Sequence, residues 1–240
     1  MILIAGGKGF IGTNLAKLFD GLDPGLYDVV DLKDGTDICD VDASKYEVIV
    51  LLAANLGHDL RMFQDNLRIC KWAMRQTAHI IYTSSAAVYA NTGTASLETD
   101  PTPAPTLYGR SKLIGEQLIK KGSKNYTILR LANVYGDGNG NGAIDIFKRG
   151  GNKIYGTGND IRDYVPVQTV CEAIKTIALN PTAYNLETFN ISTEMPQTTI
   201  GVFMQYGQGE PDHLPERGFD VKYSVLSNQK AKQAGLINDN

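Results

Sequence analysis

Four glycines near the start of the chain, Gly6, Gly7, Gly9 and Gly12, directly follow a short apolar run from Met1 to Ala5. They satisfy two overlapping patterns, Gly-x-Gly-x-x-Gly and Gly-x-x-Gly-x-x-Gly. Glycine here permits a tight turn, a close approach of the backbone to a pyrophosphate, and tight packing of the next helix on the strand. The amide dipoles of that helix then point toward the phosphates. The segment therefore predicts a strand, a turn and a helix that bind a dinucleotide.

An acidic residue at the right distance supports this interpretation. Asp31 lies at the end of a second predicted strand, residues 27–32, nineteen residues after Gly12. A carboxylate there can accept hydrogen bonds from both ribose hydroxyls of NAD, and it would repel the additional phosphate of NADP. NAD is therefore the expected cofactor. Lys33 could soften that repulsion, so NADP stays as the alternative.

The rest of the chain continues the alternation of strands and helices. Buried strands are predicted at residues 48–53, 79–83 and 126–131, with helices around residues 65–76 and from about residue 107. This order is typical of an α/β protein with a doubly wound parallel Rossmann sheet. After Asn133, glycine, asparagine and proline become frequent, and we expect loops interrupted by a helix from Val167 to Leu179.

The change in residue composition after Asn133 suggests a domain and a smaller lobe. We expect an NAD-binding Rossmann domain made of residues 1–133 and 166–192. We expect a small C-terminal substrate-binding lobe made of residues 134–165 and 193–240.

Tyr108 and Lys112 are four residues apart in a segment with helical character, so their side chains share one helix face. Tyrosine is a poor base near neutral pH unless cations favour the phenolate, and Lys112 and the nicotinamide ring would supply that field. With 12 tyrosines in the chain, about one such pair arises by chance. Ser85 adds weight because it follows the strand at 79–83, and ligands bind at the carboxyl ends of such strands. We predict that Ser85, Tyr108 and Lys112 form a catalytic centre.

With these features the sequence resembles the extended short-chain dehydrogenase/reductase family, in particular its NAD-dependent epimerase/dehydratase branch, which acts on nucleotide sugars. The matching segments are Gly6-Gly-Lys-Gly-Phe-Ile-Gly12, Asp40-Val41, Leu52-Ala-Ala54, Asn66, Ser84-Ser-Ala-Ala-Val-Tyr89, Tyr108-Gly-Arg-Ser-Lys112, Leu129-Arg-Leu-Ala-Asn-Val-Tyr-Gly136 and Ile161-Arg-Asp-Tyr-Val165.

The resemblance implies a role for each matching residue. Tyr108 would be the general base or acid, Lys112 would favour its phenolate and hold the nicotinamide ribose, and Ser85 would steer the substrate hydroxyl. Asp40 and Val41 look like the adenine contact. The implied NAD-binding residues are Gly6, Gly9, Phe10, Ile11, Gly12, Asp31, Asp40, Val41, Leu52, Ala53, Ala54, Tyr108 and Lys112.

On the substrate side, Asn133 resembles the residue that meets the diphosphate or the sugar. Arg162 and Arg217 resemble phosphate-binding arginines, since a planar guanidinium donates two parallel hydrogen bonds to a diphosphate. Arg217 could equally be a solvated surface residue, and Asn66 is interpreted as structural. Because members of the family commonly dimerise through a pair of helices, the resemblance implies a homodimer through the helices near residues 65–76 and 107–121.

The two positions after Ser85 favour one reaction. Dehydrating members of the family carry an Asp-Glu pair there, and members that epimerise and then reduce carry a cysteine at the second position, whereas this chain has Ala86 and Ala87. We expect an NAD-dependent epimerase of a nucleotide sugar, most simply at C4, that removes a hydride to form a transient ketone and then returns it. The alternatives are a dehydrogenase of a sugar or another secondary alcohol, and a dinucleotide-sensing protein without turnover.

The length departs from the family's usual pattern. At 240 residues the chain is short, with a brief link between Ala54 and Asn66 and a compressed region from Thr193 to Val225. The substrate lobe could be reduced, the substrate could be smaller, or a second chain could complete the pocket.

Composition argues against nucleic acid and membranes as partners and favours a cytoplasmic location. The net charge of −3 creates no positive field for nucleic acid or an anionic membrane. The three cysteines are far apart without a Cys-x-x-Cys pair, which favours reduced thiols in the cytoplasm, and the three scattered histidines predict no metal site. The longest apolar stretch, Val48 to Ala54, is too short for a bilayer, and no leader is apparent. We therefore expect a cytosolic protein that begins at its natural N-terminus.

Overall fold

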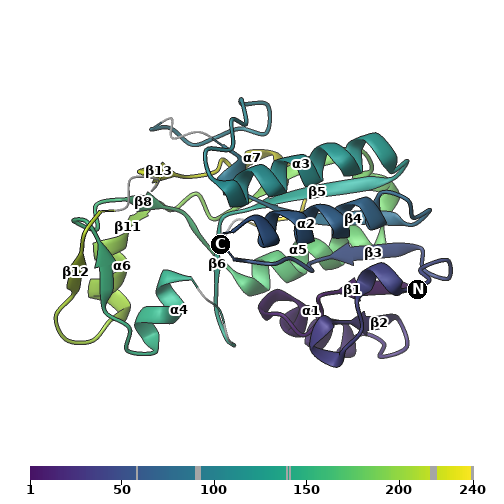
Figure 1. Ribbon diagram of the computed structural model, residues 1–240, viewed down its shortest axis with the longest axis horizontal. Coiled ribbons are helices and arrows are strands. Elements are labelled where there is room, and N and C mark those ends of the chain that lie inside the picture. Colours follow the sequence, from purple (N-terminus) through teal and green to yellow (C-terminus); the bar gives the residue numbers. More distant parts are fainter. Residues whose placement is uncertain (58, 90–92, 139, 141, 217–220, 239–240) are drawn as a thin grey trace.

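The computed structural model describes residues 1–57, 59–89, 93–138, 140, 142–216 and 221–238. Its centre is a sheet of six strands in the order β10-β5-β4-β3-β1-β2 (Figure 1). Every neighbouring pair in this sheet is parallel. The strands are β1 Ile2–Ala5, β2 Tyr27–Val30, β3 Val48–Leu51, β4 His79–Ser85, β5 Tyr126–Leu131 and β10 Glu187–Ile191. The predicted fold class, a doubly wound parallel sheet, is confirmed.

Helices cover both faces of the sheet. Helices α1 (Phe10–Asp20) and α5 (Val167–Leu179) pack against each other on one face, and α2 (Leu60–Ala73) and α3 (Leu107–Gly122) pack on the other. Within β1, Ile2 and Ile4 join the first core cluster and Leu3 and Ala5 join the second. Because successive strand residues point to opposite faces, a strand buried on both sides must be apolar throughout. This explains the uninterrupted apolar runs in the sequence.

The order of the strands reverses beside β1. The chain runs from β1 to β2 on one side and then crosses back to β3 on the other side. Ligands of such sheets bind outside the carboxyl ends of the strands, at the point where the order reverses. The connection from β2 to β3 contains two 3₁₀ helices, η1 (Leu32–Asp34) and η2 (Ile38–Asp40).

Several element ends differ from the predicted ones because side chains cap the helices. The second strand ends at Val30 rather than at residue 32, since the Asp31 carboxylate caps η1 by accepting from the amide of Lys33. The helix predicted around residues 65–76 begins at Leu60, because Asp59 caps it through the amide of Met62. Such capping satisfies amides that have no partner inside the helix.

The region predicted as loops contains many short elements. They are β6 Asn133–Tyr135, α4 Ala143–Lys148, β7 Lys153–Tyr155, β8 Ile161–Arg162, β9 Tyr164–Pro166, η4 Pro181–Tyr184, β11 Gln197–Thr198, α6 Thr199–Tyr206, β12 Asp212–Leu214, β13 Tyr223–Ser224 and α7 Gln229–Gln233. In Figure 1, α4, α6 and β12 lie together at one side, apart from the main sheet.

A separate small core holds this group. Its buried members are Ile144, Phe147, Ile154, Tyr164, Val202 and Phe203. Phe147 and Phe203 join α4 to α6 through an edge-to-face contact with ring centroids 5.2 Å apart. The C-terminal segment instead returns to the main core, where Leu226, Ala231 and Leu236 are buried. The expected lobe from residue 193 to 240 therefore shares the main core at its C-terminal end.

Candidate active site

The glycine loop lies at the carboxyl ends of β1 and β3. Gly6 has a φ of +86°, and a β-carbon on it would lie 2.6 Å from the backbone nitrogen of Ala53. A β-carbon on Gly12 would lie 2.4 Å from the carbonyl oxygen of Gly6. Both approaches are to backbone atoms that cannot move aside, so no other residue fits at these two positions. The loop therefore brings the ends of β1 and β3 and the start of α1 into close contact.

The N-terminus of α1 fits an anionic group. Gly9 is its N-cap residue, and no side chain caps the helix there. The first amides of a helix lack partners within it and carry its positive dipole end. Phe10 and Ile11 are half-buried, and Gly12 is buried. The backbone of these predicted cofactor residues thus suits the pyrophosphate of a dinucleotide.

Asp31 is held beside this loop. Its carboxylate accepts hydrogen bonds from the amides of Lys8 and Lys33, each at 2.9 Å. The ammonium of Lys33 donates to the carbonyl oxygen of Lys8 at 2.7 Å and forms no ion pair with Asp31. The two backbone bonds fix the carboxylate at the end of β2, where the adenosine ribose of a dinucleotide lies in this fold.

The remaining predicted cofactor residues follow β3 or lie in the connection from β2 to β3. Leu52, Ala53 and Ala54 follow β3 and are half-buried, and the amides of Leu52 and Ala53 both donate to the carbonyl oxygen of Ala5. Asp40 is exposed at the end of η2, and Val41 after it is half-buried.

Asp37, which the sequence analysis did not single out, ties η2 to α2. Its carboxylate accepts from Arg68 at 2.6 Å and from the amide of Cys39 at 2.9 Å. The hydrogen bond from Arg68 holds the pKa of Asp37 below its usual value. An acidic residue preceding a 3₁₀ turn was the available sequence signal for this contact.

Tyr108 and Lys112 lie in the first turns of α3. Thr106 caps this helix, accepting from the amide of Gly109 at 3.0 Å. Lys112 is only 4% exposed, and its ammonium donates to the carbonyl oxygen of Thr83 in β4 at 3.0 Å. The same ammonium lies 5.9 Å from the ring centroid of the half-buried Tyr108. The two side chains are thus together, with the lysine anchored to the neighbouring strand.

Ser85 ends β4 next to the start of α3. Its hydroxyl accepts from the amide of Ala87 at 3.2 Å and caps the short helix η3 (Ala86–Val88). Helix α3 packs on η3 so closely that a β-carbon on Gly109 would lie 2.2 Å from the carbonyl oxygen of Ala87. This contact brings the residue after Tyr108 against the turn that Ser85 begins. The turn that begins at Ser85 and the helix that carries Tyr108 and Lys112 are therefore in contact at the carboxyl edge of the sheet. A hydroxyl, a phenol and an ammonium are side chains suited to moving a proton from an alcohol.

Asn66, for which the sequence suggested a structural role, hydrogen-bonds groups of the protein itself. It is 4% exposed, and its side-chain nitrogen donates to the carbonyl oxygen of Asn55 and to the hydroxyl of Ser111. Its side-chain oxygen accepts from the amide of Asn55. Asn66 thereby links the segment after β3 to α3, one residue before Lys112.

A buried ion pair behind the site was not predicted. Glu116 in α3 accepts two hydrogen bonds from Arg130 in β5, at 2.7 and 3.0 Å, and a third from Ser84 at 2.6 Å. Both charged side chains are at most 5% exposed. Glu116 lies one helical turn after Lys112, so its place on the inner face of α3 could have been found from helical spacing.

The predicted substrate residues lie on the short strands. Asn133 in β6 donates through its amide and its side chain to the carbonyl oxygen of Asp163, at 3.1 and 2.9 Å. Arg162 in β8 donates to the carbonyl oxygen of Ile161 at 3.0 Å, and its guanidinium lies 3.8 Å from the carboxylate of Asp160. Asn133 and Arg162 thus flank Asp163. Arg217 lies outside the described residues.

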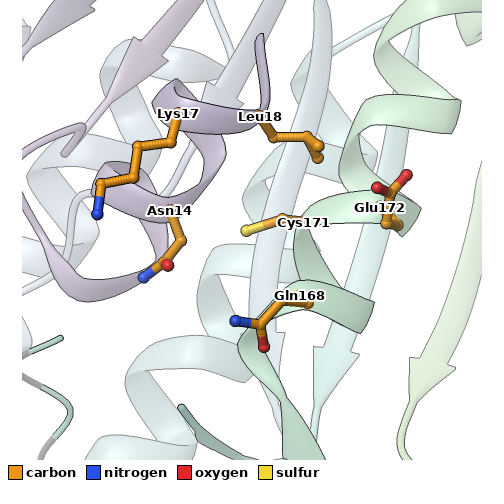
Figure 2. Close-up of a pocket in the computed structure, with 6 residues that line it drawn as sticks. All are labelled: Asn14, Lys17, Leu18, Gln168, Cys171 and Glu172. Atoms are coloured by element: carbon orange, nitrogen blue, oxygen red, sulfur yellow. The ribbon is translucent and has the colours of Figure 1, made fainter. Parts of the chain in front are cut away.

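One surface hollow lies away from these residues. It has a volume of about 270 Å³ and opens between α1 and α5, and Figure 2 shows Asn14, Lys17 and Leu18 on one side and Gln168, Cys171 and Glu172 on the other. The thiol of Cys171 donates to the carbonyl oxygen of Ile11, and burial raises its pKa to about 12. Because the thiolate is the nucleophilic form, this cysteine is unreactive near neutral pH. The hollow contains none of the predicted site residues.

Two further features concern the described residues only. None of their helices is both long enough and apolar enough to cross a membrane. Within the same part of the chain, no three or more His, Cys, Asp or Glu side chains are grouped so that they could hold a metal ion.

Comparisons with known proteins point to one family. The model of the NAD dependent epimerase/dehydratase family matches residues 2–192. A UDP-glucose 4-epimerase-like protein of Methanocaldococcus jannaschii is 31% identical in an alignment 243 positions long, gaps included, which covers 80% of this chain and 77% of that protein.

Solved structures share the fold. The UDP-glucose 4-epimerase of Thermus thermophilus, solved in complex with NAD, has a TM-score of 0.80 at 23% identity and covers 98% of this chain and 93% of its own. A dTDP-glucose 4,6-dehydratase of Streptomyces venezuelae has a TM-score of 0.87 at 18% identity and covers 100% and 92%. The shared fold therefore includes epimerases and dehydratases alike.

Proposed function

The chain belongs to the NAD-dependent epimerase/dehydratase family, and on this premise we propose that it is an epimerase of a nucleotide sugar, most simply at C4. The observation that supports the proposal is that the ammonium of Lys112 lies beside the ring of Tyr108, on a helix packed against the turn that begins at Ser85 and continues with Ala86 and Ala87. The cofactor of the family is NAD. The uncapped start of α1 would hold its pyrophosphate, Asp31 its adenosine ribose, and Lys112 its nicotinamide ribose.

Tyr108, Lys112 and Ser85 have different roles in the proton transfer. NAD, when bound, supplies the acceptor for the hydride of the substrate's C–H bond and returns it. Tyr108 takes the proton of the secondary hydroxyl as the ketone forms and gives it back as the alcohol is restored. The ammonium of Lys112 favours the phenolate in this exchange. Ser85 donates a hydrogen bond to the same oxygen and so aligns it with Tyr108.

The choice of epimerisation over dehydration depends on Ala86 and Ala87. Elimination of water needs a second acid and base near the sugar, and the half-buried methyl groups of these two residues supply neither. With NAD as the hydride acceptor and donor, oxidation at one carbon followed by reduction from the other face needs one acid–base group, Tyr108, and no second acid and base. The minimal site therefore favours epimerisation.

For the substrate, we assign the diphosphate to Arg162 and the sugar or diphosphate to Asn133, both within or next to the small substrate lobe. Arg162 is 20% exposed and pairs only distantly with Asp160, at 3.8 Å. A diphosphate could therefore replace that carboxylate and accept two parallel hydrogen bonds from the guanidinium. Arg217 is a further candidate for the same group.

The test follows the sugar and the cofactor separately. The purified protein is incubated with NAD and a panel of UDP-, dTDP-, GDP- and CDP-sugars, while NMR reports the sugar and absorbance reports NADH. Conversion of a sugar to its C4 epimer without net NADH is the expected result. A 4-keto-6-deoxy product would contradict the argument from Ala86 and Ala87.

Two other functions give different results in the same assay. Stoichiometric NADH would identify a dehydrogenase of a sugar or another secondary alcohol, which needs the same three residues. Tight NAD binding without conversion of any sugar would identify a dinucleotide-sensing protein. The retention of Ser85, Tyr108 and Lys112 together favours an enzyme over a sensor.

We also propose a homodimer through α2 and α3, in the reducing cytoplasm. The outer surface of α2 carries a shallow hollow lined by Leu60, Phe63, Gln64, Leu67, Arg68 and Lys71. Leu60 is 69% exposed, and a second copy of the helix pair would cover it. The three cysteines are free, as a reducing compartment requires. Light scattering should give twice the mass of 26.1 kDa, and Leu67→Glu should reduce it to the monomer.

A further inference from the structure

The ammonium of Lys112 is buried, and no carboxylate among the described residues pairs with it. Its one hydrogen bond within the described part of the chain is to the carbonyl oxygen of Thr83, at 3.0 Å. An ammonium has three N–H donors, and burial of a charge is unfavourable unless its surroundings compensate it. Something other than an acid must therefore stabilise the charge in this position.

The aromatic ring of Tyr82 provides such a partner. The ammonium of Lys112 lies 5.2 Å from the centroid of this ring, within the range in which the negative face of an aromatic ring attracts a cation. Tyr82 is 2% exposed, and the attraction is strongest where water is excluded. The ring centroids of Tyr82 and Tyr108 lie 5.2 and 5.9 Å from the ammonium. The charge is thus held within reach of two rings and one carbonyl group.

The ring of Tyr82 is itself fixed in place. A β-carbon on Gly115 would lie 2.4 Å from its hydroxyl oxygen, so α3 presses directly on it. The hydroxyl also hydrogen-bonds the Cys70 side chain and lies 3.5 Å from the carbonyl oxygen of Lys112. Burial raises the pKa of Tyr82 well above its usual value, so the ring stays neutral. A neutral, immobile ring is a constant source of attraction for the ammonium.

We propose that Tyr82 is a positioning residue for the reaction: its ring face holds the ammonium of Lys112 close to the carbonyl oxygen of Thr83 and the ring of Tyr108. This inference rests on the proposed function. Without the ring, the flexible lysine side chain would spend less time at Tyr108, and its charge would favour the phenolate less. Tyr82 touches neither substrate nor reacting atoms, so its effect passes through Lys112.

The test compares side chains that keep or remove the ring. Tyr82→Phe keeps the ring and loses the hydroxyl, whereas Tyr82→Leu removes the ring and fills much of the space. Tyr82→Leu should lower kcat roughly tenfold, change the KM for the sugar little, and move the acidic limb of the pH profile of kcat to higher pH by about half a unit or more. Tyr82→Phe should restore most of kcat and the original profile.

A buried control separates positioning from stability. Ile80 lies two residues earlier on the same face of β4 and is fully buried. Ile80→Ala should lower the melting temperature as much as Tyr82→Leu does, and leave the pH profile unchanged. If the pH profile of Tyr82→Leu matches that of Ile80→Ala, the ring only fills space and the proposal is wrong.

Two further measurements keep the test decisive. If Tyr82→Leu does not fold, a trifluorinated phenylalanine at position 82 keeps the shape and weakens the negative ring face. It should shift the pH profile in the same direction as Tyr82→Leu, and an unshifted profile would refute the proposal.

If the wild-type protein converts no sugar, the proposed function fails, and titration with NAD decides the positioning role. Tyr82→Leu should then raise the Kd for NAD severalfold relative to Tyr82→Phe, and equal Kd values would refute it.

Discussion

Gly109 and Ala87 approach each other so closely that a β-carbon on Gly109 would lie 2.2 Å from the carbonyl oxygen of Ala87. This contact joins the helix that carries Tyr108 and Lys112 to the turn that begins at Ser85. The absence of one side chain therefore sets the distance between the two halves of the candidate active site.

The first prediction concerns this contact. Gly109→Ala should push α3 away from η3, lower kcat by roughly 100-fold, and reduce the free energy of unfolding by about 1–3 kcal/mol. Steady-state kinetics and urea denaturation measure the two effects. Gly21→Ala is the matched control, because Gly21 has a helical φ of −70° and its added β-carbon would meet nothing closer than 3.5 Å. An active Gly109→Ala variant would show that the spacing is not critical.

The second prediction concerns the base. Tyr108→Phe should leave the Kd for NAD nearly unchanged and remove turnover by orders of magnitude, because the proton acceptor is lost while the ring remains. Isothermal titration with NAD and the NMR assay measure the two quantities. Tyr46→Phe serves as the control, since the Tyr46 hydroxyl bonds Asp28 at the far side of β2. Retained turnover in Tyr108→Phe would mean that another group is the base.

The third prediction concerns the buried ion pair. Glu116→Gln removes the charge that compensates Arg130, and loss of one partner of a buried pair costs about 3–5 kcal/mol. The free energy of unfolding in urea should fall by about that amount. Asp28→Asn breaks the exposed pair with Lys45 and should change it by less than about 1 kcal/mol. Equal effects of the two substitutions would show that burial does not matter here.

The fourth prediction concerns pH. His79 is 6% exposed, and burial lowers its pKa from 6.5 to about 4. Its Nε2 lies 2.8 Å from the hydroxyl of Thr127, which itself donates to the carbonyl oxygen of Tyr184. The folded protein therefore keeps His79 neutral, while the unfolded chain takes up a proton below pH 6.5. Stability contributed by the neutral form should be lost as the pH falls from 6.5 to about 4.

The measurement compares His79→Gln with the wild type. The glutamine amide can still donate to Thr127 but does not titrate. Urea unfolding across this pH window should show the wild type losing on the order of 3 kcal/mol more than the variant. Parallel curves for the two proteins would mean that His79 is not the group responsible.

The elements that follow from local pattern were predicted well. Strand β5 and helix α5 have the predicted ends, Tyr126–Leu131 and Val167–Leu179. The glycine loop could also be found from the sequence, because the steric demand of a turn acts on neighbouring residues. The assignment of Ser85, Tyr108 and Lys112 to one catalytic site stays a prediction. The interactions that form β5, α5 and the glycine loop lie mostly between residues close together in the sequence.

The elements held by distant contacts could not be predicted in this way. Strand β10 is short and only partly apolar, and it exists because β5 offers it a parallel edge. Helices α4 and α6 are stabilised by a small core assembled from segments far apart in the sequence. Short elements gain little from local propensity, so tertiary packing decides them.

The sequence by itself determined the parallel sheet, the glycine loop and the residue types at the candidate centre. The pattern of apolar residues, the positions of the glycines and the four-residue spacing of Tyr108 and Lys112 are all local properties of the chain. Only the tertiary structure decided what surrounds Lys112. The ring of Tyr82, the carbonyl oxygen of Thr83 and the ring of Tyr108 meet its ammonium because α3 packs on β4 at the bare surface of Gly115. The environment of a buried charge depends on groups from different elements, and their distances are set by packing rather than by sequence spacing.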